Sequence, residues 1–263
     1  MTDLNQALDV AKQIAEVGGR TAMSHYGRDP ETKRKSDGTW VTEADWAVEA
    51  LVRLRLSRAF PDHNLLGEEE GLTGAGGGPP TDGAPTWIID PIDGTNNYMR
   101  EIPVWATLIA LQIDGRNVLG VCHAPALCES YDAAVGLGAR MNGSSIAVSD
   151  TADLAEATFL HGGPERFEAK GIEDVYAAIG ARAFRTRGFG DFWGHMLVAR
   201  GAAELMIEAE LSTWDVAALE PIVSEAGGRL TNLAGERWSH LDPCVTTNGK
   251  LHDAALALAS ERS

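Results

Sequence analysis

The sequence predicts a mixed α/β protein in which helices and strands form layers. Three observations lead to this fold class. The N-terminal part has the apolar periodicity of amphipathic helices, the centre has short apolar runs that alternate as strands do, and the last part mixes the two patterns. The 263 residues, 44% of them hydrophobic, are enough for one large domain or two modest ones with a substantial core.

Helices prevail in the first part of the chain. Apolar and small residues recur at helical spacing over 4–18, which predicts an amphipathic first helix. The polar run 28–39 is expected to form a loop or hairpin that ends at a strand over 40–42. A second helix is expected over 43–60, followed by a strand over 64–67. The inward face of the second helix is expected to carry Ala47, Leu51 and Leu54.

Strands prevail in the centre, and helices return in the second half. The segment 71–85 is rich in Gly and Pro and is expected to be a surface loop. Strands are then expected at 87–89, 104–113, 118–123 and 130–135. The second half is expected to contain a strand at 205–208 and helices at 172–181, 195–201 and 217–226. Pro221 predicts a kink or an irregular first turn in the last helix.

Composition limits the partners. The chain has 22 basic and 38 acidic side chains, a net charge of −16. General binding to nucleic acid or to an anionic membrane is excluded, because both need a basic face. No apolar run is long enough to span a membrane, and the N-terminus does not read as a signal peptide. The three cysteines match no metal or redox motif and are expected to be small buried residues, so a cytoplasmic location is expected.

A division near residue 150 is expected, into an N-terminal α+β part (1–149) and a C-terminal α/β part (150–263). No linker marks this boundary, so the two parts are expected to share an extensive interface.

The most informative string is Asp90-Pro91-Ile92-Asp93-Gly94-Thr95, which follows an apolar run. We expect Asp90 at the end of a strand and Asp93 after a sharp turn, with Gly94 letting the backbone approach a ligand. Two carboxylates this close repel each other unless a cation lies between them, and hard oxygen ligands suit Mg²⁺ or Mn²⁺. A short helix beginning at Thr95 would direct free N–H groups at an anion. The alternative is an acidic turn with two solvated aspartates.

Two distant acidic motifs strengthen the metal hypothesis. Glu68-Glu69-Glu70 follows Gly67 at the end of a probable strand, where a solvated charge run is the alternative. Asp215 lies in Trp214-Asp215-Val216-Ala217-Ala218 at an expected helix start, where a simple helix cap is the alternative.

Taken together, these motifs resemble the signatures of the inositol monophosphatase family of metal-dependent sugar-phosphatase-like enzymes. The resemblance covers nearly the whole chain, and the motifs occur in the family's order. They are Gly67-Glu68-Glu69, Asp90-Pro91-Ile92-Asp93-Gly94-Thr95, and Trp214-Asp215-Val216-Ala217-Ala218 with Glu225-Ala226-Gly227-Gly228. The resemblance implies a layered αβαβα sandwich and, as is common in the family, a homodimer.

The resemblance also implies the cofactor and its ligands. Two or three Mg²⁺ ions are expected, with Mn²⁺ as a possible substitute. Glu68, Asp90 and the backbone carbonyl of Ile92 would hold one ion. Asp90, Asp93 and Asp215 would hold a second, and Glu68 with waters would support a third.

Catalytic and phosphate-binding roles follow from the same resemblance. Glu68, Thr95 and Asp45 would form the catalytic group, in which Thr95 and Asp45 orient the water that attacks phosphorus. The backbone N–H groups of Gly94 and Thr95 would bind the phosphate, and Asp93 would also lie at the substrate.

The residues before the last metal motif bear on the substrate. Gly190-Asp191-Phe192-Trp193-Gly194-His195 resembles the histidinol-phosphate phosphatase branch of the family. Asp191 and Glu208 would pair with the protonated amine of that substrate, and Trp193 would contact its ring or cation. The alternatives are that Trp193 packs in the core beneath the site and that His195 is a structural histidine.

The sequence thus predicts a Mg²⁺-dependent phosphomonoesterase that converts histidinol phosphate to histidinol and phosphate in histidine biosynthesis. Within the same class, the alternative is an inositol-1-phosphate or broad sugar-phosphate phosphatase. From another class, the alternative is a non-catalytic metal-binding regulator or scaffold, which the loss of a ligand residue would favour. All four acidic ligand residues are present.

Overall fold

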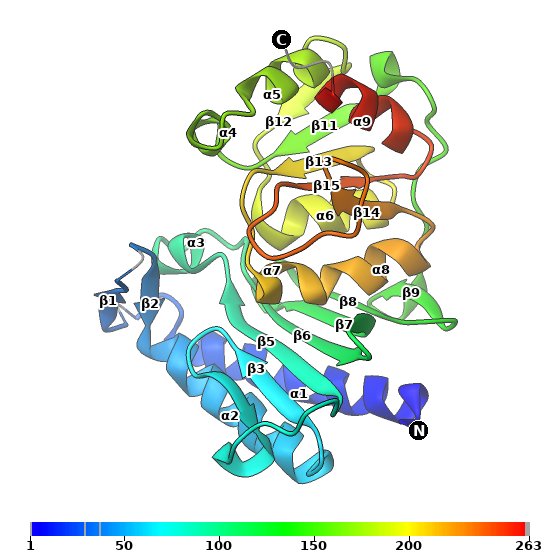
Figure 1. The fold of residues 1–263 in the computed structure, drawn as a ribbon. Coiled ribbons are helices and arrows are strands. Elements are labelled where there is room, and N and C mark those ends of the chain that lie inside the picture. Colours follow the sequence, from blue (N-terminus) through cyan, green and yellow to red (C-terminus); the bar gives the residue numbers. More distant parts are fainter. Residues whose placement is uncertain (1, 29, 37, 261–263) are drawn as a thin grey trace.

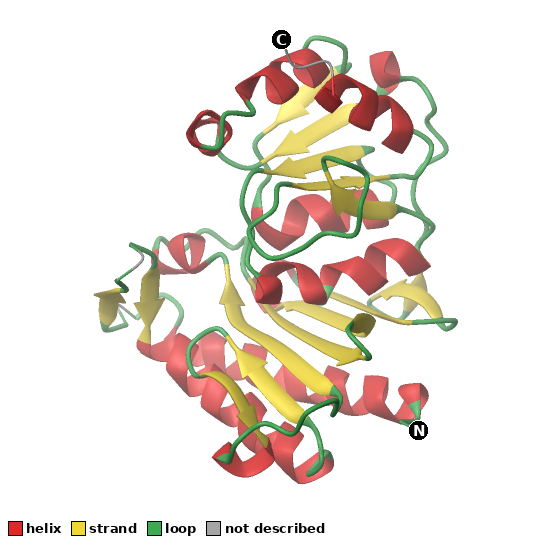
Figure 2. Ribbon diagram, viewed as in Figure 1, coloured by secondary structure: helices red, strands yellow, loops and turns green. Residues whose placement is uncertain are grey.

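The computed structural model describes residues 2–28, 30–36 and 38–260, and its elements form five layers in the order helix, sheet, helix, sheet, helix (Figures 1 and 2). The layered αβαβα fold expected from the sequence is confirmed. The division of the chain near residue 150 stays a prediction.

The first sheet has eight strands in the order β10-β9-β8-β7-β6-β5-β3-β4. Among the described residues, β3 and β5 pair in parallel and the other neighbours are antiparallel. Helices α1 (Leu4–His25) and α2 (Glu43–Ala59) cover its outer face. The strands are β3 (Asn64–Gly67), β4 (Gly71–Gly74), β5 (Thr86–Asp93), β6 (Ala106–Ile113), β7 (Arg116–Ala124), β8 (Glu129–Ala134), β9 (Gly138–Met141) and β10 (Ser144–Ser145). A separate hairpin joins β1 (Thr32–Arg34) to β2 (Trp40–Thr42).

The second sheet has five strands in the order β12-β11-β13-β15-β14. Its strands are β11 (Thr158–His161), β12 (Arg185–Arg187), β13 (Leu205–Glu208), β14 (Arg229–Asn232) and β15 (Cys244–Thr247). Its outer face carries α4 (Pro164–Ala169), α5 (Glu173–Gly180) and α9 (His252–Ser260). The middle layer consists of α6 (Asp191–Ala199), α7 (Thr213–Ala217) and α8 (Leu219–Glu225), and α3 (Thr95–Met99) follows β5.

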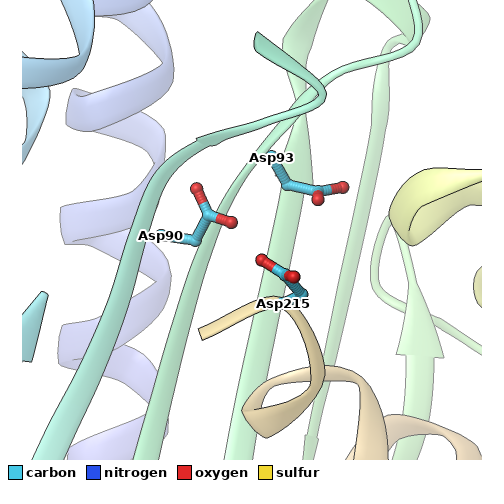
Figure 3. Close-up of side chains that lie close together, drawn as sticks. All are labelled: Asp90, Asp93 and Asp215. Carbon is cyan, nitrogen blue, oxygen red and sulfur yellow. The ribbon is translucent and has the colours of Figure 1, made fainter. Parts of the chain in front are cut away.

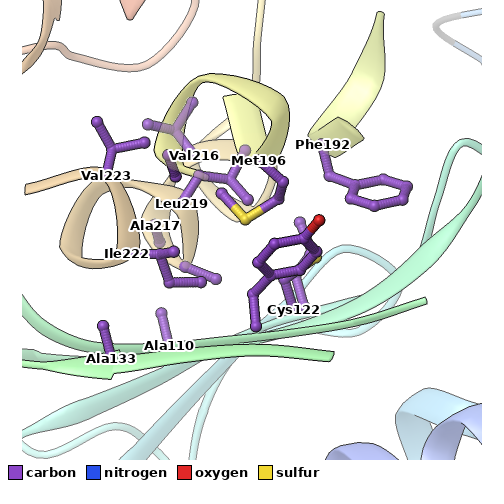
Figure 4. Packing of buried hydrophobic residues seen from close by; sticks show 14 of the residues in the cluster. Ala110, Cys122, Ala133, Phe192, Met196, Val216, Ala217, Leu219, Ile222 and Val223 are labelled. Carbon is purple, nitrogen blue, oxygen red and sulfur yellow. The ribbon is translucent and has the colours of Figure 1, made fainter. Parts of the chain in front are cut away.

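The largest core cluster lies between the first sheet and the middle helices. Figure 4 shows Met196, Leu219 and Ile222 of these helices above Ala110 and Cys122 of the strands. Small residues on the strands let the helices approach closely. This packing fixes α7, which carries Asp215, against β6 and against β5, the interior strand that carries Asp90.

The predicted inward face of the second helix is wrong. Leu54 is 50% exposed, and Ala47 and Leu51 are only half-buried. The charged residues Glu49 and Arg53 lie on the buried face instead, together with Ala44, Val48, Val52 and Leu56. Apolar residues at helical spacing lie on both sides of this helix, so their spacing alone does not identify the buried side, and the ion pair makes the true inward face look polar.

Other departures concern short elements. The expected loop 71–85 begins with β4, an edge strand that needs little apolar content because it has one neighbour. The expected helix 217–226 corresponds to α8, which a break at Ala218 separates from α7, and Pro221 lies in the first turn of α8 as expected. Among the strands of the second sheet the sequence predicts β13 alone, because β13 has three consecutive apolar residues and the others have at most two.

Cys122 and Cys244 are buried as expected, whereas Cys128 is exposed. In the described part of the chain, no helix combines the length and the apolar content that crossing a bilayer requires.

Candidate active site

The carboxylates of β5 lie at a bulge in the strand. The strand does not end at Asp90 as expected, and its register with β6 shifts between Asp90 and Asp93. The Pro91 carbonyl accepts a hydrogen bond from the Thr107 hydroxyl at 2.9 Å. The bulge replaces the predicted sharp turn, because Pro91 has no N–H to donate to a regular ladder.

Gly94 links the bulge to α3. Its φ is 84°, in the left-handed region, and a Cβ there would lie 2.8 Å from the Val104 carbonyl oxygen. Only glycine meets both demands without strain. The short helix begins at Thr95, as predicted.

Three carboxyl groups converge at this point (Figure 3). Asp90 and Asp93 come from β5 and Asp215 from the first turn of α7, and one oxygen of each lies within 4.8 Å of the others. Asp215 also caps its helix, because its Oδ2 accepts a hydrogen bond from Ser212 N at 2.7 Å. The cap and the cluster are thus compatible, since a carboxylate has two oxygens.

The chemistry of this cluster fits a divalent cation. Asp90 Oδ1 is buried and has no hydrogen-bond partner among the described residues. Burial raises the pKa of Asp90 and of Asp93 well above the usual value, and the neighbouring carboxylates raise both further. Burial likewise raises the pKa of Asp215 to about 7. A cation would remove this repulsion and bind the unpartnered oxygen, since oxygen ligands of this kind suit hard divalent ions.

Asp45 and Thr95 lie side by side next to the cluster. Thr95 Oγ1 is 3.5 Å from Asp45 Oδ1 and donates to the Ile92 carbonyl at 3.0 Å. Asp45 Oδ2 accepts hydrogen bonds from the Thr42 backbone N–H and hydroxyl, at 2.8 and 2.6 Å, in a capping box. Burial raises the pKa of Asp45 to about 6, although these hydrogen bonds lower it. The structure therefore brings together the three residues Asp45, Ile92 and Thr95.

The predicted alternative of a solvated charge run is wrong for Glu68 and Glu69. Their side chains are 15% and 2% exposed, and Lys35 Nζ donates to both, at 2.8 and 2.6 Å. Burial raises the pKa of Glu69 to about 7 despite the hydrogen bond from Lys35. Glu68 is a close electrostatic neighbour of Asp90 and of Asp215. Glu68 therefore borders the cluster.

Two further acidic residues, Asp191 and Glu208, lie near Asp93. Glu208, at the end of β13, accepts a hydrogen bond from Asp191 N at 3.1 Å. Burial raises the pKa of Glu208 to about 8, and the charge of Asp191 raises it further. Both carboxyl groups act electrostatically on Asp93, whose Oδ2 accepts a hydrogen bond from Phe192 N at 2.8 Å. This pair would attract a cationic group placed next to the three-carboxylate cluster.

Two aromatic residues of α6 have structural contacts. Trp193 Nε1 donates to Glu129 Oε2 at 3.2 Å, and its ring centroid is 5.0 Å from that of Phe189. His195 is buried, shares a hydrogen bond with Thr246 Oγ1 at 2.8 Å, and has its pKa lowered to about 4 by burial. His195 is therefore a core residue, whereas the predicted substrate contact of Trp193 stays a prediction.

Sequence reasoning missed the residues that hold these carboxylates. Asn97 Nδ2 donates to Asp191 Oδ2 at 2.8 Å and to the Val104 carbonyl at 2.9 Å. Arg166 in α4 is close enough to lower the pKa of Asp191 and of Glu208. No local signal marks either residue, because their partners are far away in the sequence.

Known proteins share this fold and its motifs. The profile of the inositol monophosphatase family matches residues 3–263. Histidinol-phosphatase of Streptomyces coelicolor is 38% identical over 273 residues, covering 100% of both chains, and that of Mycobacterium tuberculosis is 40% identical, covering 97% of this chain and 96% of its own. The solved structure of Thermotoga maritima IMPase has a TM-score of 0.85 at 31% identity, covering 97% of each chain. The chain therefore belongs to the inositol monophosphatase family, whose members are metal-dependent phosphatases.

Proposed function

We propose that the protein hydrolyses histidinol phosphate to histidinol and inorganic phosphate. The observation that carries this proposal is the acidic pair of Asp191 and Glu208 beside the three-carboxylate cluster. In a phosphate ester whose leaving alcohol carries a protonated amine, the phosphate would lie at the metal ions of the three-carboxylate cluster and the amine at Asp191 and Glu208. The names of the Streptomyces coelicolor and Mycobacterium tuberculosis relatives support the same substrate.

Mg²⁺ is the proposed cofactor, with two or three ions bound and Mn²⁺ as a substitute. Asp90, Asp93 and Asp215 would hold one ion. Glu68, Asp90 and the Ile92 carbonyl would hold another, and Glu68 with waters would support a third. Bound divalent ions neutralise charge on the phosphoryl oxygens and lower the pKa of water.

The chain's own groups would orient the reaction. Asp45 and Thr95, 3.5 Å apart, would hold the attacking water through their oxygens, with Glu68 beside them. The N–H groups of Gly94 and Thr95 would donate to the phosphate at the start of α3. In-line attack would then release the alcohol on the side of Asp93.

The amine of the substrate would lie between Asp191 and Glu208. Hydrogen bonds between an ammonium and a carboxylate are charge-assisted and strong in a buried site. Asn97 would keep the Asp191 carboxylate in place through its 2.8 Å hydrogen bond. Trp193 is the proposed contact for the imidazole ring.

The test is phosphate release from histidinol phosphate and from inositol 1-phosphate, measured side by side with saturating Mg²⁺. A higher kcat/KM for histidinol phosphate is expected. A tenfold or greater preference for inositol 1-phosphate would overturn the substrate assignment. Phosphate release that is indifferent to EDTA would favour the non-catalytic metal-binding alternative.

Glu208→Gln is expected to lower kcat/KM for histidinol phosphate by about 10- to 100-fold, because one hydrogen bond to a charged group contributes about 1.5–3 kcal/mol. Hydrolysis of p-nitrophenyl phosphate, which has no amine, is expected to change much less. Glu210→Gln is the matched control, since Glu210 is exposed and pairs with Lys170 at 3.2 Å. Equal losses on both substrates would remove Glu208 from amine recognition.

A homodimer and a cytoplasmic location are further expectations, the first from the family and the second from the composition. Sedimentation of the purified protein measures the oligomeric state directly.

A further inference from the structure

Glu49 is a fully buried carboxylate whose oxygens point to the turn between β3 and β4. Its Oε2 accepts a hydrogen bond from Glu69 N at 2.8 Å, and its Oε1 accepts one from Glu70 N at 3.0 Å. These two N–H groups belong to the turn that carries Glu68. The Glu49 side chain, which projects from α2, therefore binds two backbone N–H groups of this turn.

Arg53 binds the other end of the same turn. Its Nε donates to Glu49 Oε1 at 2.8 Å, and its Nη2 donates to the Gly71 carbonyl at 2.5 Å. A further bond at 3.1 Å joins Nη1 to Thr73 Oγ1. The ion pair thus spans the turn from its second residue into β4.

Gly67 makes room for this arrangement. A Cβ at Gly67 would lie 2.1 Å from Glu49 Oε1, so a larger residue would push the carboxylate away. On the opposite side, Glu68 N donates to the Ile89 carbonyl at 3.2 Å, one residue before Asp90. The backbone of Glu68 is therefore held on one side by its bond to β5 and on the other through its neighbour Glu69, whose N–H binds Glu49.

One face of α2 contacts two separate segments of the site, the start of α3 and the turn between β3 and β4. Asp45 and Glu49 are four residues apart and lie on the same helix face. Asp45 reaches Thr95, while Glu49 reaches the turn that carries Glu68.

We propose that Glu49, together with Arg53, is a positioning residue that sets the orientation of the Glu68 carboxylate and thereby the affinity for divalent cations. The inference rests on the proposed function only through the role of Glu68 as a metal ligand. Burial of an ion pair alone contributes little to stability, because the desolvation penalty offsets the attraction. The contacts of Glu49 and Arg53 instead hold the turn that carries the proposed metal ligand Glu68. Residues that contact and orient metal ligands commonly tune metal affinity in this way.

The experiment is a Mn²⁺ titration by calorimetry, without substrate, of the parent protein, Glu49→Gln, Glu68→Gln and the double variant. Glu49→Gln is expected to weaken Mn²⁺ binding by about 10- to 100-fold, the range found for residues behind metal ligands. In the Glu68→Gln background, the same change is expected to have little further effect, because Glu49 acts through Glu68. At saturating metal, KM for the phosphate ester is expected to stay near the parent value.

Glu204→Gln is the matched control. Glu204 is also buried and accepts a hydrogen bond from the Thr158 N–H at 2.7 Å, but it lies at the second sheet, one residue before β13. It is expected to lower Tm while leaving Mn²⁺ affinity unchanged. Equal Mn²⁺ affinity of Glu49→Gln and the parent, or full additivity with Glu68→Gln, would overturn the proposal.

Arg53→Lys is a second variant that tests the same proposal if Glu49→Gln does not fold. It keeps the charge beside Glu49 and loses the contacts to Gly71 and Thr73, so weaker Mn²⁺ binding is again expected, and parent affinity would overturn the proposal. Failure of the proposed function is a separate result, namely a parent that binds Mn²⁺ and releases no phosphate from histidinol phosphate. A parent that binds no Mn²⁺ would overturn both.

Discussion

Asp90→Asn is expected to abolish divalent-cation binding and to lower phosphate release by about 10³-fold or more, while the protein still folds. Asp90 is the residue that both proposed ions share, and its Oδ1 has no hydrogen-bond partner in the described part of the chain. Loss of metal-based charge stabilisation removes several kcal/mol, and each 1.36 kcal/mol is tenfold in rate.

The fold is expected to tolerate this change because the charge itself is unfavourable without metal. Burial and four neighbouring carboxylates raise the pKa of Asp90. Asparagine keeps the shape and removes that repulsion, so the Tm of the metal-free variant is expected to equal or exceed that of the parent. Thermal unfolding in EDTA checks this point, and calorimetry with Mn²⁺ checks binding.

Asp132→Asn is the control for Asp90→Asn. Asp132 is likewise buried with an unpartnered Oδ2 among the described residues, but it pairs with Lys12 at 2.8 Å, away from the cluster. It is expected to keep both metal binding and activity. Near-parent turnover in Asp90→Asn would contradict the metal-site assignment.

The acidic motifs could be read from the sequence because each is local. Asp90 and Asp93 lie three residues apart across one bulge, and Asp215 lies at a helix start with Ser212 before it. The sequence predicts that Gly94 lets the backbone approach a ligand, and the structure adds that its left-handed backbone requires glycine. Convergence of these motifs in space came from the family resemblance and not from periodicity.

The residues that hold the carboxylates could not be predicted, because each contact joins distant parts of the chain. Asn97 and Asp191 are 94 residues apart, and Asp93 and Phe192 are 99 apart. The inward face of α2, which carries Glu49 and Arg53, is hard to predict for a related reason. Two charges on the buried face look like a solvent-facing stripe until the turn that they bind is known.

Metal-free protein is expected to lose stability as the pH rises from about 7 to 9. Burial raises the pKa of Asp215 and of Glu69 to about 7 and that of Glu208 to about 8. The folded state holds protons at these groups that the unfolded state releases near pH 4, and it gives up the last of them between about pH 7 and 9. The free energy of unfolding therefore falls with pH until the folded-state pKa values are passed.

The buried histidines affect the free energy of unfolding only below about pH 6.5. Burial lowers the pKa of His195 and of His252 to about 4, so their contribution rises with pH between about 4 and 6.5 and is then constant. Below pH 6.5 the two effects oppose each other. Above pH 7 the histidines no longer contribute, and the thiols of Cys122 and Cys244, whose pKa values are raised by burial, act in the same direction as the carboxyl groups. One proton of difference over one to two pH units is worth about 1–3 kcal/mol, or about 2–5 °C in Tm for a chain of this size.

Divalent cations should reverse this slope, since a ligand carboxylate must be deprotonated to bind and binding stabilises the folded state. With saturating Mg²⁺ or Mn²⁺, the Tm is expected to rise or stay level from pH 7 to 9, so the gain over EDTA grows with pH. Glu208→Gln is expected to flatten the EDTA profile near pH 8 without removing the metal-dependent gain, because Glu208 is not a proposed ligand. A Tm in EDTA that rises from pH 7 to 9 would contradict the conclusion that these buried carboxyl groups destabilise the metal-free protein when they are ionised.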